Sequence, residues 1–165
     1  MFASKTLLVL AMSIAALAAP ASIAATEVTL PAAHSNDLLK RQSDNYNLLY
    51  HYRSDVLGHS QLQYDANLEA NALRTAVEGH GQMIHQLFPG TLAQVLGPGG
   101  PFDYDNVLVG GWLCERPDMP GLNGICDNYR GWLHTTTGHA DILTSEAYTR
   151  VGCAWDGGIW ACDLA

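Results

Sequence analysis

The residues that could carry out chemistry lie mostly in the last third of the chain. His139 directly follows Gly138, after a run of three threonines at 135–137. Two apolar, β-prone runs come next, residues 150–155 and 159–162, and each of them carries one cysteine. Imidazole is a common metal ligand, and cysteines can form disulfide bonds. The threonine hydroxyls are most simply explained as partners of backbone groups in a loop.

The four cysteines are Cys114, Cys126, Cys153 and Cys162, and an even number in a secreted chain is typical of two disulfide bonds. Three pairings are possible, and the sequence alone does not choose among them. Local geometry favours Cys114–Cys126 and Cys153–Cys162, because an Asp-Gly pair between the two β-prone runs indicates a hairpin whose facing strands carry the second pair. Zinc binding by these cysteines is disfavoured, since no Cys-x-x-Cys spacing occurs. No serine stands in a Gly-x-Ser-x-Gly motif, so the sequence offers no evident catalytic nucleophile.

The first residues have the pattern of a secretory signal peptide, residues 1–25. Lys5 precedes an uncharged apolar run that is too short to span a membrane and is followed by small residues. We therefore expect a secreted, extracellular protein with no transmembrane segment in its mature form. Residues 26–41 are a candidate pro-segment, because they end at the dibasic pair Lys40-Arg41. Cleavage there would leave residues 42–165 as the mature domain, and the alternative is an ordinary pair of solvated surface residues.

Length and charge narrow the classes of function. A chain of 165 residues has room for one domain. Its formal net charge is −8, with no basic stripe that could neutralise phosphates, so we expect no nucleic-acid partner.

Two helices are expected in the first half of the chain. Residues 45–57 carry apolar side chains at steps of three and four, and residues 66–77 do the same with small alanines on one side. Asp65 stands where it can cap the second helix. Residues 80–104 are glycine-rich and loop-like, and residues 106–114 predict a further short helix.

These segments resemble the CAP superfamily (the SCP domain), which covers cysteine-rich secretory proteins, antigen-5 and the pathogenesis-related group-one proteins. The resemblance covers roughly residues 43–164, and its last part is closer to bacterial and fungal members than to venom proteins. His51 in the first helix is interpreted as a structural, hydrogen-bonded histidine. The matching motifs are His51-Tyr52, Leu62-Gln63-Tyr64-Asp65 with Leu68, Ala72 and Ala76, Gly138-His139 with Ile142-Leu143, and Gly152-Cys153-Ala154.

Three positions of the family pattern need comment. Asp55 stands where the family has an arginine, so an ion pair that anchors the first helix is expected to be lost. Gln94 is the nearest match to a family glutamate and lacks its charge. Glu115, after Trp112, matches a second family acid. Alternatively Trp132 aligns with the tryptophan that precedes Gly-His in bacterial members, which lack that acid.

The resemblance implies an α+β fold, a three-layer α-β-α sandwich with a mostly antiparallel central sheet. It also implies a solvent-filled cleft that can hold a divalent metal, with His85 and His139 as ligands and Glu115 and Gln94 at the edge. Two imidazoles suit an ion such as zinc, and the uncharged Gln94 predicts weak binding. The alternative is that the two histidines are unpaired surface residues.

The function implied is that of an extracellular binding protein. Its partner would be a sterol, a fatty acid, or an extracellular or host protein. Apolar loop positions such as Phe88, Leu96 and Phe102 are candidates for contact with a ligand, and they could equally belong to the core. The alternative is a metal-dependent hydrolase or protease-like enzyme that uses a metal-activated water in the same cleft. No catalytic residue is assigned, and the binding role is preferred.

Overall fold

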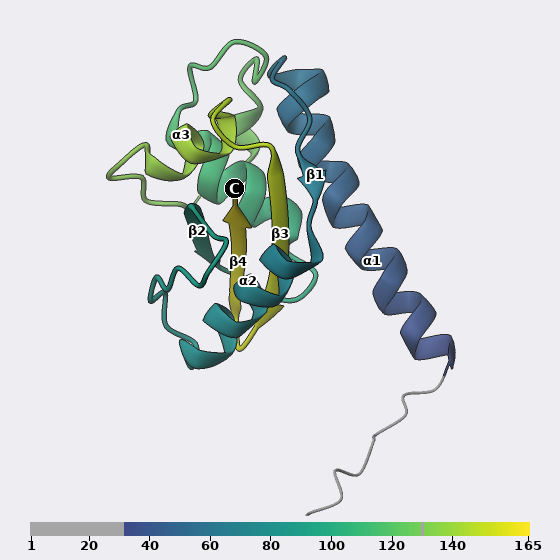
Figure 1. Ribbon diagram of the computed structural model, residues 1–165. Coiled ribbons are helices and arrows are strands. Elements are labelled where there is room, and N and C mark those ends of the chain that lie inside the picture. The colour runs from purple at the N-terminus through teal and green to yellow at the C-terminus, as the bar shows by residue number, and fades with distance from the viewer. Residues whose placement is uncertain (1–31, 130) are drawn as a thin grey trace, which may run out of the picture. The chain divides into compact units, whose positions relative to one another are not determined.

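The computed structural model describes residues 32–129 and 131–165, and Figure 1 shows the arrangement of their helices and strands. The expected signal peptide and the first part of the candidate pro-segment lie outside the described residues. Within the described residues no helix is long and apolar enough to cross a membrane. The elements in chain order are α1 (Ala32–Tyr50), η1 (His51–Val56), β1 (Gln63–Tyr64), α2 (Ala66–Glu78), β2 (Ala93–Pro98), η2 (Asn106–Trp112), η3 (Leu113–Glu115), η4 (Ile125–Asn128), α3 (Gly138–Thr144), β3 (Arg150–Asp156) and β4 (Ile159–Leu164).

The four strands form one mixed sheet in the order β1-β3-β4-β2. The two inner ladders, β3 with β4 and β4 with β2, are antiparallel, whereas β1 pairs in parallel with β3 through Gln63–Arg150 and Tyr64–Val151. The α+β class is confirmed, but the sheet is mixed and not mostly antiparallel. The reason is that β1 lies at the edge as a two-residue link between η1 and α2, where it is free to run in the direction of β3.

Helices pack against both faces of this sheet at very short range. A Cβ added to Gly152 of β3 would lie 1.9 Å from the backbone nitrogen of Glu69 in α2. On the other face, a Cβ on Gly97 of β2 would lie 2.5 Å from a methyl group of Val107 in η2. Glycine at these two positions therefore permits the close approach of helix and strand. The core divides accordingly into a small cluster under α2 and a larger one under α1, η1 and η2.

The predicted elements are largely present. Helix α2 begins at Ala66 as expected, and the Asp65 carboxylate accepts hydrogen bonds from the backbone N–H groups of Asn67 (2.8 Å) and Leu68 (3.3 Å). The first helix is longer than expected, because α1 begins at Ala32 and continues into the π-helical turn η1. The two disulfide bonds are those favoured by local geometry, Cys114–Cys126 and Cys153–Cys162.

Arg53 corrects one expectation from the sequence. The helix-anchoring cation is not lost, because Arg53 of η1, two residues before Asp55, is almost fully buried and binds backbone carbonyls. Its guanidinium donates to the carbonyl oxygens of Ser60 (2.6 Å) and Ser145 (2.9 Å) and also to that of Leu143. Burial lowers the pKa of Arg53, and the nearby Glu146 carboxylate opposes that effect.

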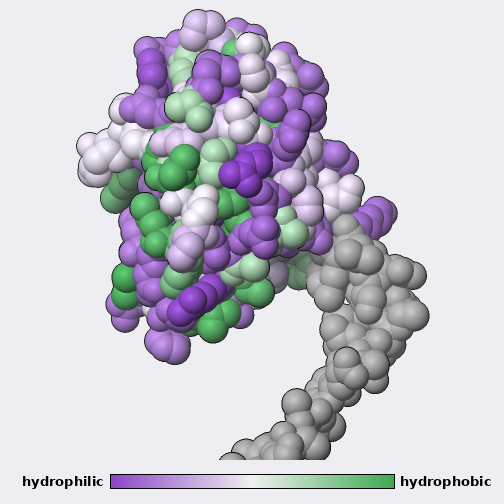
Figure 2. All heavy atoms as spheres, viewed as in Figure 1, coloured by the Kyte–Doolittle hydropathy of each residue, from purple (hydrophilic) through white to green (hydrophobic). Residues whose placement is uncertain are grey.

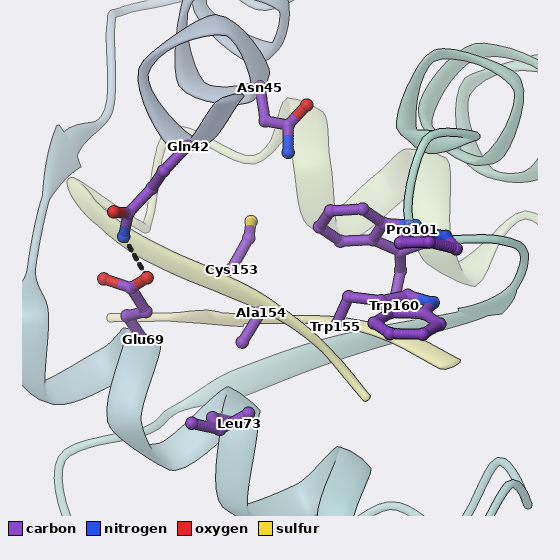
Figure 3. Close-up of a pocket in the computed structure, with 9 residues that line it drawn as sticks. All are labelled: Gln42, Asn45, Glu69, Leu73, Pro101, Cys153, Ala154, Trp155 and Trp160. Carbon is purple, nitrogen blue, oxygen red and sulfur yellow. Dashed lines mark hydrogen bonds between the residues drawn. The ribbon is translucent and has the colours of Figure 1, made fainter. Parts of the chain in front are cut away.

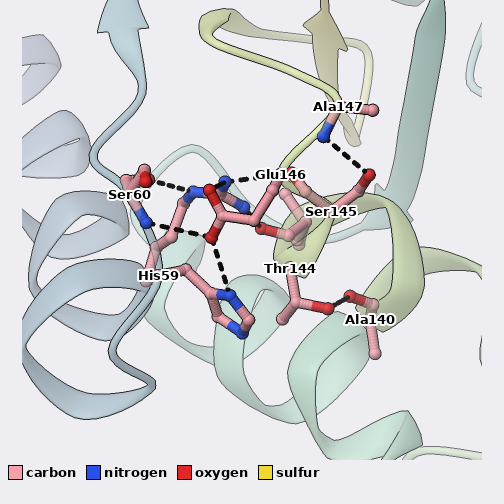
Figure 4. Close-up of polar contacts among 9 residues, drawn as sticks. His59, Ser60, Ala140, Thr144, Ser145, Glu146 and Ala147 are labelled. Carbon is pink, nitrogen blue, oxygen red and sulfur yellow. Dashed lines mark hydrogen bonds and ion pairs between the residues drawn. The ribbon is translucent and has the colours of Figure 1, made fainter.

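Glu146 completes this anchor at the surface. Its carboxylate lies 3.8 Å from the Arg53 guanidinium and accepts hydrogen bonds from the Ser60 backbone N–H (3.1 Å) and from His59 Nδ1 (3.0 Å), as Figure 4 shows. The bonds from Ser60, followed by that from His59, lower the pKa of Glu146 to about 2. η1 and the segment after α3 are thereby tied together.

Candidate functional site

Two of the site residues expected from the sequence, Glu115 and His139, are hydrogen-bonded to each other. Glu115 Oε1 lies 2.7 Å from His139 Nδ1, and the Glu115 side chain is only 5% exposed against 29% for His139. A buried carboxylate accepts hydrogen bonds and does not donate them, so Nδ1 carries the proton and Nε2 is left with a lone pair. The carboxylate therefore orients the imidazole so that its second nitrogen remains available.

Local backbone structure explains why this pair forms. Helix α3 has no side-chain cap of its own at Thr137, and its first N–H groups need acceptors. Glu115 Oε2 accepts from the backbone N–H of His139 (2.7 Å) and of Ala140 (3.1 Å). One side chain at the end of η3 thus caps α3 and fixes its histidine.

The second pair is Gln94 with His85, and it is built in a similar way. Gln94 in β2 is 4% exposed. Its Nε2 donates to Asp163 Oδ1 (2.8 Å) and to the Gln86 carbonyl (3.0 Å), which fixes the orientation of the amide. Gln94 Oε1 then accepts from the Gln86 backbone N–H (3.2 Å) and from His85 Nδ1 (3.0 Å). The lone pair of His85 therefore also lies on Nε2.

Gln94 and Asp163 form the centre of a buried polar group beneath α2. Asp163 also accepts from the Thr91 hydroxyl (2.7 Å), and Gln94 Nε2 lies 3.0 Å from the Thr75 hydroxyl oxygen. Burial raises the pKa of Asp163, although its hydrogen bonds from Thr91 and Gln94 act in the opposite direction. Gln94 is thus an integral member of a buried network and not a residue at the edge of an open cleft.

The structure does not bring the four predicted residues into one group. Glu115 and His139 line a cleft of about 220 Å³, and neither His85 nor Gln94 lines it. Among the described residues no group of three or more His, Cys, Asp and Glu side chains is placed to hold a metal ion. We refer to this cavity as the cleft; its lining residues are Met83, Leu96, Gly97, Pro98, Gly111, Trp112, Glu115, Trp132, Leu133, His134 and His139.

A larger pocket, of about 400 Å³, lies elsewhere in the domain and was not predicted. Figure 3 shows that it lies between α1, which contributes Gln42 and Asn45, and α2, which contributes Glu69 and Leu73. Strand β3 crosses the space between the two helices. We refer to this cavity as the edge pocket; its lining residues are Gln42, Asn45, Glu69, Leu73, Pro101, Cys153, Ala154, Trp155 and Trp160.

The edge pocket exists because β1 is short. The hydroxyl oxygen of Tyr46 accepts from the Cys153 backbone N–H (2.8 Å), so Cys153 directs its backbone toward the β1 side of β3 and not toward β4. Among the residues that the structure describes, no strand covers that side beyond Asp65, and α1 and α2 approach across the uncovered edge. The indole N–H groups of Trp155 and Trp160 donate to the carbonyls of Gly99 (2.8 Å) and Gly100 (2.9 Å), which holds both rings in place.

The remaining sequence-predicted positions have varied surroundings. Of the apolar loop residues, Leu96 is buried and lines the cleft, Phe88 lies under the Arg74 guanidinium at 4.0 Å, and Phe102 is 74% exposed. His51 is exposed, with Nδ1 3.1 Å from Asp55. Lys40 is exposed on α1, and cleavage after Arg41 remains a prediction.

Comparison with known proteins finds similarity at the level of structure only. No protein-family model and no curated protein matches the chain. One similar solved structure is MpPR-1i, from a crystal soaked with selenourea, with 15% identity over 82% of this chain and 93% of that chain and a TM-score of 0.44. Another is a cysteine-rich secretory protein from Staphylococcus aureus, with 14% identity, a TM-score of 0.41, and coverage of 76% of this chain and 38% of that chain. The chain is thus similar in structure to a pathogenesis-related (PR-1) protein and to a cysteine-rich secretory protein, two groups of the CAP superfamily.

Proposed function

We propose that the chain is a secreted CAP-domain protein that binds an apolar ligand, a fatty acid or a sterol, outside the cell. The observation that carries this proposal is the edge pocket. Its volume of about 400 Å³ is within the range of roughly 300–1,000 Å³ that small-molecule sites occupy. Two disulfide bonds, typical of oxidising compartments, and the signal-peptide pattern support secretion.

Membership in the CAP superfamily is part of this proposal. Its support is the match of sequence motifs together with helices packed on both faces of the sheet, which agrees with a three-layer α-β-α sandwich.

The chemistry of the edge pocket fits a ligand with a long apolar body and one polar end. Leu73, Ala154, Trp155 and Trp160 supply apolar walls. Polar groups gather at one end, where Gln42 Nε2 donates to Glu69 and the Asn45 side chain points toward the pocket (Figure 3). A hydroxyl group could hydrogen-bond there, and a carboxyl group would have to enter protonated because of Glu69. Long-chain alcohols and sterols are therefore favoured over ionised fatty acids.

The test is displacement of a fluorescent sterol from the secreted protein and two variants of α2. Leu73 and Val77 are equally exposed, at 45%, and lie one turn apart, but only Leu73 lines the pocket. We expect Leu73→Asp to weaken binding about tenfold, because it places a charge against the apolar ligand, and Val77→Asp to change it less than twofold. No binding to the wild-type protein, or equal losses in both variants, would refute the proposal.

Weak binding of a divalent metal such as zinc is a second candidate. The specific observation is that His139 and His85 are each held at Nδ1 by a neighbouring side chain, which leaves Nε2 as the ligand atom. Glu115 and Gln94 would then orient the ligands and would not bind the ion themselves, as outer-shell partners commonly do. His85 does not line the cleft that contains His139, so each imidazole offers one nitrogen on its own, which is consistent with weak binding.

Calorimetry with zinc tests the metal site. We expect weak binding by the wild-type protein, loss of binding in His139→Ala with little change in stability, and release of the ion on acidification, because only neutral imidazole is a ligand. Equally negligible binding by wild type and His139→Ala would remove the metal site and leave the edge pocket unaffected. A hydrolase would need a more complete site, since catalytic zinc is usually held by three protein ligands. The binding role is therefore better supported.

A further inference from the structure

Two loops beside the cleft carry large apolar side chains that are exposed to solvent. The first joins α2 to β2 and contains Met83, which is 54% exposed, and the second precedes α3 and contains Leu133, which is 93% exposed. Both residues line the cleft. We refer to Met83 and Leu133 as the cleft rim. In Figure 2 hydrophobic residues gather on the part of this face near α2 and the loop that follows it.

The first loop is held to the protein by its polar groups, and its apolar side chains are left outside. The backbone of Gln86 is bonded on both sides, because its N–H donates to Gln94 and its carbonyl accepts from Gln94 and from the Thr75 hydroxyl (3.1 Å). Asn71 on α2 donates to the carbonyl of Pro89 (3.2 Å). Met83 precedes these anchored positions.

The second loop has the same design. Trp132 Nε1 donates to Asn106 Oδ1 (3.1 Å), and its ring lies so close to Gly110 that an added Cβ there would be 2.7 Å from the indole nitrogen. His134 Nε2 lies 2.9 Å from the carbonyl oxygen of Gly110. Leu133, between the two anchored residues, is the one that projects. Met83 and Leu133 of the cleft rim are therefore exposed on loops that hydrogen bonds and ring packing hold against the rest of the protein.

Acidic residues are missing from these loops in an otherwise acidic chain. The first loop, residues 79–92, contains no Asp, Glu, Lys or Arg, and the second, residues 129–137, contains one charged residue, Arg130, whereas the whole sequence has 16 acidic and 8 basic residues. The one carboxylate that lines the cleft, Glu115, is buried and bonded to His139. An exposed apolar rim on loops with so few charged residues is unusual for a surface that faces only water.

We propose that the cleft rim docks on the surface of a neutral, zwitterionic phospholipid membrane. Exposed Leu and Met side chains gain free energy by entering the acyl boundary, and a partly buried Trp with a polar tip suits the headgroup level. The net charge of −8 disfavours an anionic surface. Protein interfaces usually carry a polar rim with complementary charges, whereas a neutral bilayer penalises any charge that enters it. The two loops contain no acidic residue and only one formal charge, Arg130, and this low charge favours a membrane over a protein partner. This inference goes beyond the proposed ligand and does not depend on it.

The experiment is flotation of the secreted protein with phosphatidylcholine vesicles. A single myristoyl chain gives an association constant of about 10⁴ M⁻¹, so binding of this strength or somewhat weaker is detectable at ~1 mM lipid. We expect Leu133→Lys to reduce the bound fraction at least tenfold and Met83→Ser to reduce it about fivefold, because each removes an inserting side chain. Phe102→Lys is the matched control, since Phe102 is also exposed but is followed by Asp103 and Asp105, and it should bind as the wild type does.

Each outcome is decisive. Binding that is lost in Leu133→Lys and kept in Phe102→Lys supports the proposal. Absence of binding by the wild-type protein overturns it, as does binding that Leu133→Lys leaves unchanged or strengthens, because the association would then be electrostatic or would involve another face. Sedimentation velocity without lipid provides a further check. A dimer that Leu133→Lys dissociates, together with no vesicle binding, would assign the rim to a second copy of the chain and overturn the membrane proposal.

Discussion

Replacing Gln94 with glutamate restores the family acid, and we predict that it destabilises the protein in a strongly pH-dependent way. Gln94 Nε2 donates to Asp163 Oδ1 at 2.8 Å and to the Gln86 carbonyl at 3.0 Å. A glutamate would place a second carboxylate against the first, and two unit charges about 3 Å apart repel by roughly 5 kcal/mol at an effective dielectric constant of about 20. The folded variant avoids this cost by keeping one proton on the pair.

The magnitude follows from the cost of that proton. In the unfolded chain a glutamate has a pKa of about 4.3, and holding a proton up to pH 7 costs about 1.4 kcal/mol per pH unit, which gives a loss of stability of about 3–4 kcal/mol at pH 7. The folded pair has raised pKa values, so the folded state binds more protons than the unfolded state. Stability of the variant therefore falls as pH rises above about 4.3, and near pH 4 the loss should be under about 1 kcal/mol. The raised pKa of Asp163 gives the wild type a weaker dependence of the same sign.

Urea denaturation of Gln94→Glu between pH 4 and pH 7 measures this directly. Gln61→Glu is the matched control, because Gln61 is exposed and the change adds the same charge. The double variant Gln94→Glu with Asp163→Asn should recover most of the loss at pH 7, since the second carboxylate is gone. A loss at pH 7 below about 1 kcal/mol, or one that does not change with pH, would contradict the arrangement of Gln94 and Asp163 described above.

Two further predictions test the packing of the fold. Arg53→Met should reduce the free energy of unfolding by about 3 kcal/mol, because the carbonyls of Ser60, Leu143 and Ser145 lose their donor. The control Arg74→Met, on the exposed face of α2, should change it by under about 0.5 kcal/mol. Similar values for the two variants in urea denaturation would show that the buried guanidinium is not an anchor. Gly152→Ala should reduce the melting temperature substantially, at a cost of at least about 3 kcal/mol of stability, because its Cβ would meet the α2 backbone. The control Gly138→Ala, with no atom within 4 Å of the added Cβ, should be neutral. A neutral Gly152→Ala would mean that α2 does not lie so close to β3.

Local signals in the sequence were sufficient to predict the helices and the hairpin, but not to predict the sites. Asp65 predicted the start of α2, and Asp156-Gly157 predicted the hairpin with its disulfide, because capping and turn formation depend on a few neighbouring residues. The direction of β1 could not be predicted, since a two-residue strand has no pattern that specifies its partner. The family resemblance suggested a cleft with Glu115, His139 and His85; Glu115 and His139 line one cleft, and His85 does not.

Other site features depend on contacts between distant segments. The bonding of Gln94 involves residues from α2, the following loop and β4, so its identity suggested a missing charge when it in fact satisfies Asp163. Arg53 was not identified from the sequence, because its role depends on hydrogen bonds to the distant carbonyls of Leu143 and Ser145. The edge pocket depends on the short length of β1, and no residue type in the sequence indicates that length.

The strand order has a consequence for how the chain acquires its structure. β4 lies between β3 and β2, and its ladder with β2 joins Ala93 to Leu164, while β1 joins Gln63 to Arg150. Two of the three strand ladders therefore join segments far apart in the chain, and folding rates fall as such long-range pairings dominate. The β3–β4 hairpin is the exception, because its strands are neighbours and Cys153–Cys162 closes it early in an oxidising compartment. We expect this hairpin to form first and to serve as the template on which α2 and then β2 assemble. Refolding from the reduced state should accordingly be much slower than refolding with both disulfides intact.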